Sequence, residues 1–192
     1  MKATETRYAC RNLGLSGFPS FDDPVWDQVP SGELAEVESG KRPFLHTAFQ
    51  LFRDDAAAAF YLKITAEDDE VHSTYRLQDE TLYTQDVFEI FISDTGLLDR
   101  YREVEVSPFD VTFTGDISFS EDGARVLDMG WELPGFVTVT RHFRKEHRTL
   151  SIWRMPYAGF AAPPEPGKPW RFNVFRVDHS RRGEELQAWQ PT

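Results

Sequence analysis

Residues 86–93 read Asp-Val-Phe-Glu-Ile-Phe-Ile-Ser, a strongly apolar, β-favouring run with one carboxylate, Glu89, at its middle. Alternate side chains of a strand point to opposite faces, so this run has two largely apolar faces. One face carries Phe88, Ile90 and Ile92, and the other carries Val87, Glu89 and Phe91. A carboxylate in such a site needs an arginine, backbone donors, a metal or a ligand's hydroxyl groups as its partner. The alternative is that Glu89 lies on a solvated outer face.

The composition around this run favours short strands. The chain has 192 residues, of which 40% are hydrophobic, and this is enough for one sizeable core in a single domain, residues 1–192. Its 16 Phe, 6 Tyr and 5 Trp, together with 12 Gly and 12 Pro, suit strands and tight turns better than a helical bundle. An all-β fold is therefore predicted.

Charge, cysteine content and the lack of long apolar segments limit which partners the chain can bind and where it is located. The formal net charge of −11 would repel phosphate backbones and anionic lipid, so the chain is expected to bind neither nucleic acid nor membrane. Cys10 is the single cysteine and cannot form an intrachain disulfide. The first ten residues lack the apolar run of a signal peptide, and no segment has the length and apolarity of a membrane span. We therefore expect a soluble, cytoplasmic protein.

Turn signals divide the chain into an arm and a core. Residues 1–45 are rich in Gly, Pro, Ser and Asp, and Phe21, Val25 and Trp26 would anchor them as a wrapping N-terminal arm. Residues 46–192 would form the core. Its predicted strands are 47–52, 59–65, 86–93, 101–106, 111–119, 136–143, 150–155 and 170–178. About eight short strands at this spacing predict an antiparallel β-sandwich, jelly-roll-like in form.

Carboxylates are the first candidates for chemistry. On the strand over residues 101–106, Glu103 and Glu105 face the same way, and either could pair with Glu89. Two carboxyl groups about 5 to 10 Å apart could hydrolyse a glycoside. Sugar binding needs the same residue types without a tuned pKa, and nucleophile motifs are missing, so we assign no catalytic residue.

Metal sites have weaker support. The five histidines are scattered, and His142 and His147 are the only close pair, at a spacing that fits no standard metal site. Asp22-Asp23 and the acidic residues of 67–70 could supply oxygen atoms to a structural calcium ion. No other cofactor is expected.

Aromatic residues are more informative. Sugar rings present apolar C–H faces and hydroxyl edges, so a sugar site needs flat aromatic walls and a few polar partners. Tyr83 lies six residues before Glu89, and Trp189 lies in a polar tail. Either could instead plug one end of the core.

Three blocks carry a family resemblance. They are Asp-Val-Phe-Glu-Ile-Phe-Ile at 86–92, Tyr-Arg-Glu-Val-Glu-Val-Ser-Pro at 101–108 and Trp-Arg-Phe-Asn-Val-Phe-Arg-Val-Asp at 170–178. In this order they resemble the carbohydrate-binding module family 9-like domains, relatives of the DOMON superfamily, from about Phe21 to Thr192. The resemblance implies a β-sandwich that binds a mono- or oligosaccharide between two aromatic walls. The walls would fall on Tyr83 and Trp189, and the contacting glutamate on Glu89.

The chain departs from that family at three places. Tyr83 stands where the family has tryptophan. The family's binding arginine and asparagine fall on Glu105 and Ser107, although a shift of register would offer Arg102. Family members also continue into a closing strand after the second tryptophan, so the sandwich edge here would be incomplete or closed by the N-terminal arm.

Together these features predict a non-catalytic saccharide-binding domain. Its predicted ligand-binding residues are Tyr83, Glu89, Trp189, Arg102 and Glu105. One alternative is a DOMON-like haem-binding electron carrier that uses Met129, Met155 and His142. Others are a glycoside-hydrolysing component and a degenerate sandwich kept for protein interaction. Tyr83 and Trp189 must lie near Glu89 for the first prediction to hold; otherwise Glu89 would be structural. The oligomeric state stays open.

Overall fold

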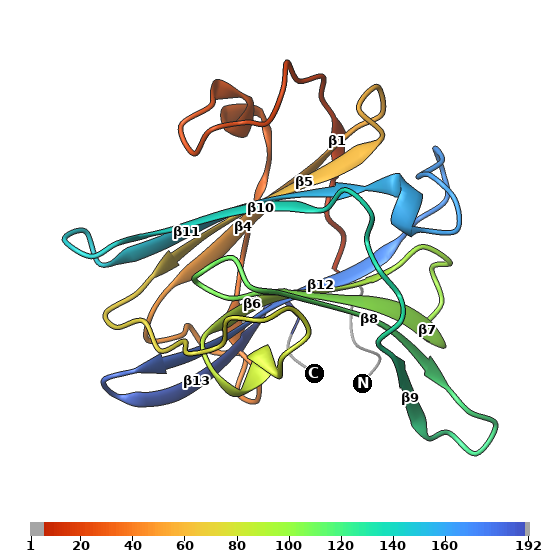
Figure 1. The fold of residues 1–192 in the computed structure, drawn as a ribbon. Helices are drawn as coiled ribbons and strands as arrows, with labels where there is room; N and C mark the ends of the chain where they lie inside the picture. The colour runs from red at the N-terminus through yellow and green to blue at the C-terminus, as the bar shows by residue number, and fades with distance from the viewer. Residues whose placement is uncertain (1–5, 191–192) are drawn as a thin grey trace.

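Two stacked sheets form the molecule (Figure 1). The structure is a computed structural model that describes residues 6–190. The six-stranded sheet has the order β1-β4-β5-β11-β10, and β2 also pairs with β4. Its strands are β1 (Arg11–Asn12), β2 (Ser31–Glu33), β4 (Thr47–Asp54), β5 (Ala59–Glu67), β10 (Val137–Phe143) and β11 (Arg148–Pro156). All its pairings are antiparallel except that of β1 with β4.

The seven-stranded sheet is wholly antiparallel, in the order β3-β13-β12-β6-β7-β8-β9. Its strands are β3 (Ala35–Glu36), β6 (Val87–Ser93), β7 (Arg100–Val106), β8 (Thr112–Phe119), β9 (Arg125–Asp128), β12 (Arg171–Ser180) and β13 (Gly183–Ala188). Three 3-10 turns, η1 (Pro24–Gln28), η2 (Leu82–Thr84) and η3 (Tyr157–Gly159), are the only helical elements of residues 6–190. None of them is long enough to cross a membrane. The predicted all-β sandwich is confirmed.

The main core lies between the sheets and follows strand alternation. Phe88, Ile90 and Ile92 all point into it, so Glu89 and Phe91 point to the outer face of the seven-stranded sheet. From the six-stranded sheet, Trp153 is fully buried in the same core. The run at 86–93 therefore lies in the interior of its sheet, with β12 on one side and β7 on the other.

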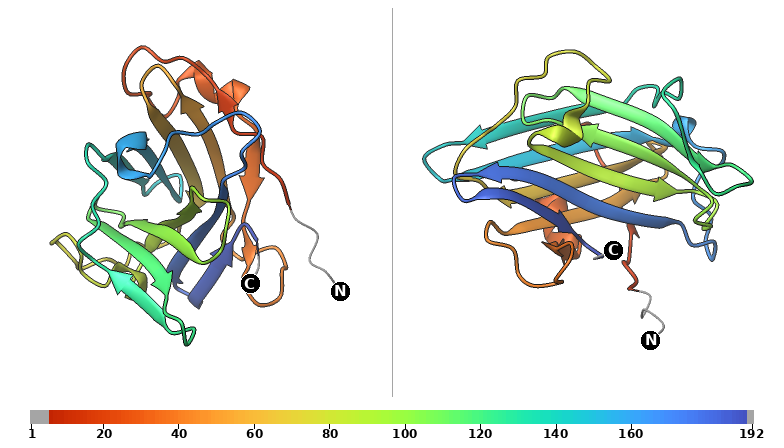
Figure 2. Two further views of the ribbon diagram at one scale, coloured as in Figure 1. Left: turned by 90° about the vertical axis from the view of Figure 1, so that its right-hand side faces the viewer. Right: turned by 90° about the horizontal axis from the view of Figure 1, so that it is seen from below.

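The N-terminal arm covers the outer face of the six-stranded sheet (Figure 2, left). Val25 and Trp26 are buried there, with Phe21 packed beside them, as the sequence predicted. The Trp26 ring meets that of Phe52 edge to face at 5.2 Å. The arm also supplies β1 and β2 to one sheet and β3 to the other, so β3 extends the edge beyond β13.

β13 is the main strand that the sequence did not reveal. Its sequence, Gly-Glu-Glu-Leu-Gln-Ala, is mostly polar and lacks apolar alternation, because one of its faces is solvated. It forms because the turn after Ser180 returns the chain along β12, where six residue pairs are in register. Residues 183–188 are therefore an ordered strand, whereas the sequence indicated a polar tail.

Gly32 gives a direct test of how the arm packs. A Cβ added at this position would lie 2.3 Å from Cε1 of the buried Phe49, its register partner on β4. Gly32→Ala is therefore expected to lower the free energy of unfolding by about 1–3 kcal/mol, as overpacking typically does. Urea denaturation measures this. Gly14→Ala is the control, since nothing lies within 4 Å of its added Cβ; an equal effect of both substitutions would contradict the packing described.

The outer face of the seven-stranded sheet is covered only in part (Figure 2, right). The segment before β6, which contains η2, crosses it, and Leu82 packs with Val87 and Phe113 in a small apolar cluster there. The remainder of this face holds the polar and aromatic residues that follow.

Candidate functional site

Three glutamates lie next to one another on the outer face of the seven-stranded sheet. Glu89 of β6 is the direct register partner of Glu105 of β7, and Glu103 lies two residues along β7 on the same face. Side chains directly opposite each other on neighbouring strands have Cβ atoms about 4.5–5.5 Å apart. All three glutamates are buried, with Glu105 only 1% exposed. We call Glu89, Glu103 and Glu105 the glutamate cluster.

Burial and mutual repulsion raise the proton affinity of this cluster. Removal from water, and then the charge of Glu103, raise the pKa of Glu89 to about 8. Removal from water, followed by the charges of Glu89 and Glu103, raises the pKa of Glu105 to about 9. Burial also raises the pKa of Glu103, although the nearby Arg125 opposes this. Burial therefore favours the protonated forms of Glu89 and Glu105.

The polar partners of the cluster are few. Arg125 of β9 donates from Nη2 to Oε2 of Glu103 at 2.7 Å. The backbone N–H of Tyr83 lies against the Glu105 carboxyl group and lowers its pKa. Within residues 6–190, Oε2 of Glu105 is buried and has no hydrogen-bond partner. This oxygen is the cluster's unused hydrogen-bonding position.

An aromatic stripe crosses four strands of the same face. It consists of Phe175 of β12, Phe91 of β6, Tyr101 of β7 and Phe119 of β8. The centroids of successive rings are 4.6, 5.3 and 6.4 Å apart, and Phe91 stacks on Tyr101 at 24°. Phe175 is the register partner of Glu89, and Phe91 is that of Glu103. The stripe and the glutamate cluster therefore form one continuous surface.

Tyr83 lies close to this surface. It belongs to η2, its backbone N–H faces Glu105, and its side chain is 57% exposed. The structure thus brings together Tyr83, Glu89 and Glu105 of the five residues predicted from the sequence. It also adds Glu103, Phe91, Tyr101 and Phe175.

Trp189 lies on the other side of the sheet. Its ring stacks on Phe172 at 4.9 Å and meets Phe49 of the opposite sheet at 5.5 Å, so it is inside the sandwich. The reason is the unpredicted strand β13, which continues as far as the Trp189 N–H bond to the Val174 carbonyl. The expected proximity of Trp189 to Tyr83 and Glu89 is therefore wrong.

Arg102 also points inward. Its Nη1 donates to Asp116 Oδ1 at 2.5 Å, and its guanidinium lies 5.2 Å from the centre of the Trp131 ring. Since Arg102 alternates with Glu103 and Glu105 along β7, it cannot share their face. Arg102 is thus neither beside the predicted ligand-binding residues nor an ion-pair partner of Glu89.

The three residues that could ligate a haem iron, Met129, Met155 and His142, do not lie together. His142 pairs in register with Thr149, and Met155 lies six residues further along β11. At about 3.3 Å per residue the offset is about 20 Å, too far for one haem iron. Met129 is in an exposed turn. Across residues 6–190, no group of three or more His, Cys, Asp or Glu side chains is placed to hold a metal ion. The structural calcium ion stays a prediction.

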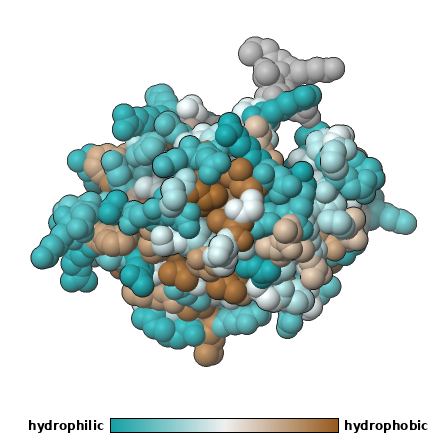
Figure 3. All heavy atoms as spheres, turned by 90° about the horizontal axis from the view of Figure 1, so that it is seen from above, coloured by the Kyte–Doolittle hydropathy of each residue, from teal (hydrophilic) through white to brown (hydrophobic). Residues whose placement is uncertain are grey.

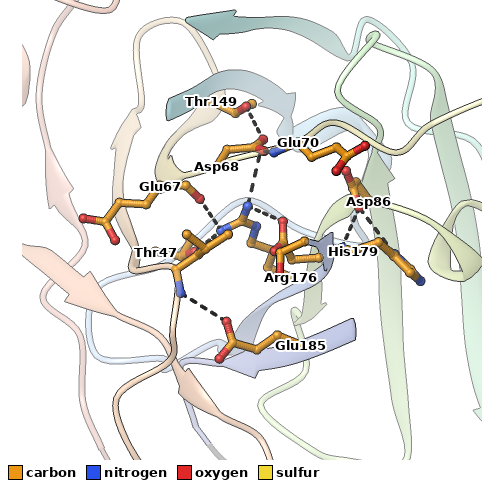
Figure 4. Close-up of polar contacts among 12 residues, drawn as sticks. Thr47, Glu67, Asp68, Glu70, Asp86, Thr149, Arg176, His179 and Glu185 are labelled. Atoms are coloured by element: carbon orange, nitrogen blue, oxygen red, sulfur yellow. Dashed lines mark hydrogen bonds and ion pairs between the residues drawn. The ribbon is translucent and has the colours of Figure 1, made fainter. Parts of the chain in front are cut away.

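A second polar cluster lies between the sheets (Figure 4). Arg176 donates to Thr47 Oγ1 at 3.0 Å, to the Glu67 carbonyl at 2.8 Å and to Asp178 Oδ1 at 2.5 Å. Asp68 lies 4.0 Å from the same guanidinium and accepts a bond from Thr149 Oγ1 at 2.6 Å. Thr47, Asp68, Thr149, Arg176 and Asp178 are almost completely buried, so the cluster links the two sheets.

Two hollows lie away from the glutamate cluster. One, of about 470 Å³, is at the β3–β13 edge, where the Glu185 carboxylate already accepts from the Phe44 and Leu45 N–H groups. The other, of about 310 Å³, lies between the arm and the outer face of β10 and β11, beside Phe18 and Phe21. Figure 3 views the molecule from above Figure 1, on the side of the six-stranded sheet, and shows apolar side chains gathered near the middle of this face. Neither hollow combines aromatic walls with unused buried polar groups.

Comparison with solved structures gives matches of fold, two of which are described here. No family model matches the chain, and no curated protein matches it. A crystal structure of a "putative carbohydrate-binding protein" from Bacteroides uniformis ATCC 8492 superposes with a TM-score of 0.75 at 11% identity, over 97% of this chain and 89% of that one. A carbohydrate-binding module of family 9 from Caldicellulosiruptor kristjanssonii, in complex with glucose, gives 0.60 at 16% identity, over 95% and 84%. The chain therefore has the two-sheet fold of a family 9 carbohydrate-binding module.

Proposed function

We propose that the chain binds a saccharide on the outer face of its seven-stranded sheet, without cleaving it. The observation that carries this proposal is that buried glutamates, one of them with an unpartnered oxygen, lie beside half-buried aromatic rings on one face. Sugars need both kinds of group, since their C–H faces pack on rings and their hydroxyl edges need donors and acceptors. The glucose complex of the Caldicellulosiruptor module supports the ligand class.

Each part of this face has a separate task. Phe91, Tyr101 and Phe175 would pack against the apolar face of a sugar ring. A protonated Glu89 or Glu105 can donate one hydrogen bond and accept others, which suits a hydroxyl group that does both. The ion pair of Glu103 with Arg125 would hold one side of the site in place. Tyr83, at the edge of this surface, would add a further wall.

Removal of a ring from the stripe tests the proposal. Tyr101→Ala is expected to weaken saccharide binding by about 1–3 kcal/mol, the range found for buried aromatic anchors. The measurement is titration calorimetry with glucose, cellobiose, xylobiose and their longer oligomers. Phe44→Ala is the matched control, because Phe44 is a half-exposed ring at the distant β3–β13 edge.

Two outcomes would overturn the proposal. The first is that no saccharide, neutral or cationic, binds to the folded protein. The second is that Tyr101→Ala and Phe44→Ala bind as tightly as the unmodified chain. Product analysis after long incubation separates binding from hydrolysis, because a binding domain leaves every oligomer intact.

A further inference from the structure

We propose that the saccharide is an amino sugar, whose ammonium group lies between Glu89 and Glu105. This inference rests on the proposed function and names its ligand class. Its basis is a local excess of acidic groups on the binding face, together with one buried carboxyl oxygen that has no partner.

The charge balance of the face is the first argument. Arg125 is the one cation in ion-pair contact with the glutamate cluster among residues 6–190, and its ion pair is with Glu103. The two arginines of β7, Arg100 and Arg102, both bind Asp116 on the other side of the sheet. Glu89 and Glu105 thus lie side by side without a cation. A ligand that brings its own positive charge would complete the site.

The geometry of the unused oxygen is the second argument. Oε2 of Glu105 is buried without a partner, and Glu89 is directly opposite on the neighbouring strand. An ammonium group has three donors and makes bonds of about 2.7–2.9 Å to carboxylates, so it can bridge two such side chains. A single hydroxyl group has one donor, so a neutral sugar would need two hydroxyl groups to reach both carboxylates.

The neighbouring rings favour the same ligand. Phe175 and Phe91 flank Glu89 on the same face, and they contact each other at 4.6 Å. A sugar that packs on these rings would place a ring substituent over the glutamates, where an ammonium near an aromatic face gains further attraction. At long range, the net charge of −11 draws a cationic saccharide towards the chain.

Proton release follows from the groups that face the site. The titratable and charged groups around Glu89 come from three elements. They are Glu103, Glu105 and Tyr101 of β7, Arg125 of β9 and Tyr83 of η2. The side chains that β12 and β8 present beside Glu89 are uncharged. Burial and repulsion raise the pKa values of Glu89 and Glu105 to about 8 and about 9. An ammonium group that stabilises both carboxylates would therefore expel protons at neutral pH.

The test compares three disaccharides that differ at one ring position: cellobiose, the glucosamine dimer and its fully N-acetylated form. Calorimetry at pH 7 with EDTA present is expected to show about tenfold tighter binding of the glucosamine dimer than of the other two, which corresponds to one charge-assisted contact. The preference should shrink as NaCl is raised. The binding heat of the glucosamine dimer should also vary with the ionisation enthalpy of the buffer, as proton release requires.

Two variants localise the effect. In the double variant Glu89→Gln/Glu105→Gln, the ratio between the amino sugar and cellobiose should fall to about one, since both carboxylates are lost. Glu121→Gln, in the exposed β8–β9 turn, should keep the tenfold ratio. Thermal unfolding confirms that each variant is folded before its titration.

The outcomes separate this inference from the proposed function. Equal binding of all three disaccharides, or a ratio that survives in the double variant, would refute the amino-sugar assignment and leave saccharide binding in place. Failure of all three disaccharides and of the longer oligomers to bind would remove both.

Discussion

Replacement of Arg176 by leucine is expected to lower the free energy of unfolding by about 3–5 kcal/mol, the usual cost of removing one partner from a buried ion pair. Arg176 is 3% exposed and lies between the sheets. Its guanidinium is the partner of Asp178 at 2.5 Å and the neighbour of Asp68 at 4.0 Å. Without it, two carboxylates would stay buried with no cation, and the Thr47 and Glu67 acceptors would lose their donor.

The pH dependence of this loss follows from the same carboxylates. Removal from water already raises the pKa of Asp178 to about 7, although Arg176 opposes the shift. Without the arginine, Asp178 would hold its proton to a higher pH. The destabilisation is therefore expected to be smaller at pH 5 than at pH 8, because protonation removes the uncompensated charge.

Urea denaturation of paired variants measures the effect. Arg181→Leu is the control, because Arg181 is exposed and lies 3.7 Å from the exposed Glu70. Loss of that surface pair should cost less than about 1 kcal/mol. Similar stability of both variants at pH 8 would show that the buried cluster does not hold the two sheets together.

The alternation of apolar residues was enough to predict most of this fold. The hairpins β4–β5 and β10–β11 coincide with predicted strand pairs, because their residues pack on the core. β13 was missed because a polar strand is specified by its partner and not by its own pattern. That omission had a direct consequence for the site, since the unseen strand is what turns Trp189 into the sandwich.

The candidate site was predicted in part for the same reason. Alternation placed Phe91 on the face of Glu89, and Glu103 on the face of Glu105. These side chains lie together because of the order of the strands in the sheet. Sequence does not fix that order, because β6 pairs both with β7, which follows it directly, and with β12, which comes much later in the chain. Phe175 therefore gained its place beside Glu89 only through the register of β12 on β6.

Stability is expected to fall as pH rises from about 5 to 9, and the glutamate cluster is a principal cause. Glu89 and Glu105 have folded-state pKa values of about 8 and about 9, above the usual value of 4.5. Between these values the folded chain binds more protons than the unfolded chain, so the free energy of unfolding decreases with pH. The contribution of Glu89 and Glu105 to the free energy of unfolding is fully present below about pH 4.5. It is lost as pH rises through their folded-state pKa values. Each pKa unit corresponds to about 1.4 kcal/mol, so the expected loss is several kcal/mol.

The double variant Glu89→Gln/Glu105→Gln isolates this effect from other titrating groups, Asp178 among them. Glutamine keeps the size and hydrogen-bonding capacity of a protonated glutamate but has no charge to desolvate. The variant should therefore match the unmodified chain in stability near pH 5 and exceed it by about 3 kcal/mol or more at pH 9. Urea denaturation in steps from pH 5 to 9 gives both curves. Parallel curves would mean that the two carboxyl groups ionise in the folded protein as freely as in the unfolded chain. In that case the cluster would lack the bound protons that an ammonium group is proposed to displace.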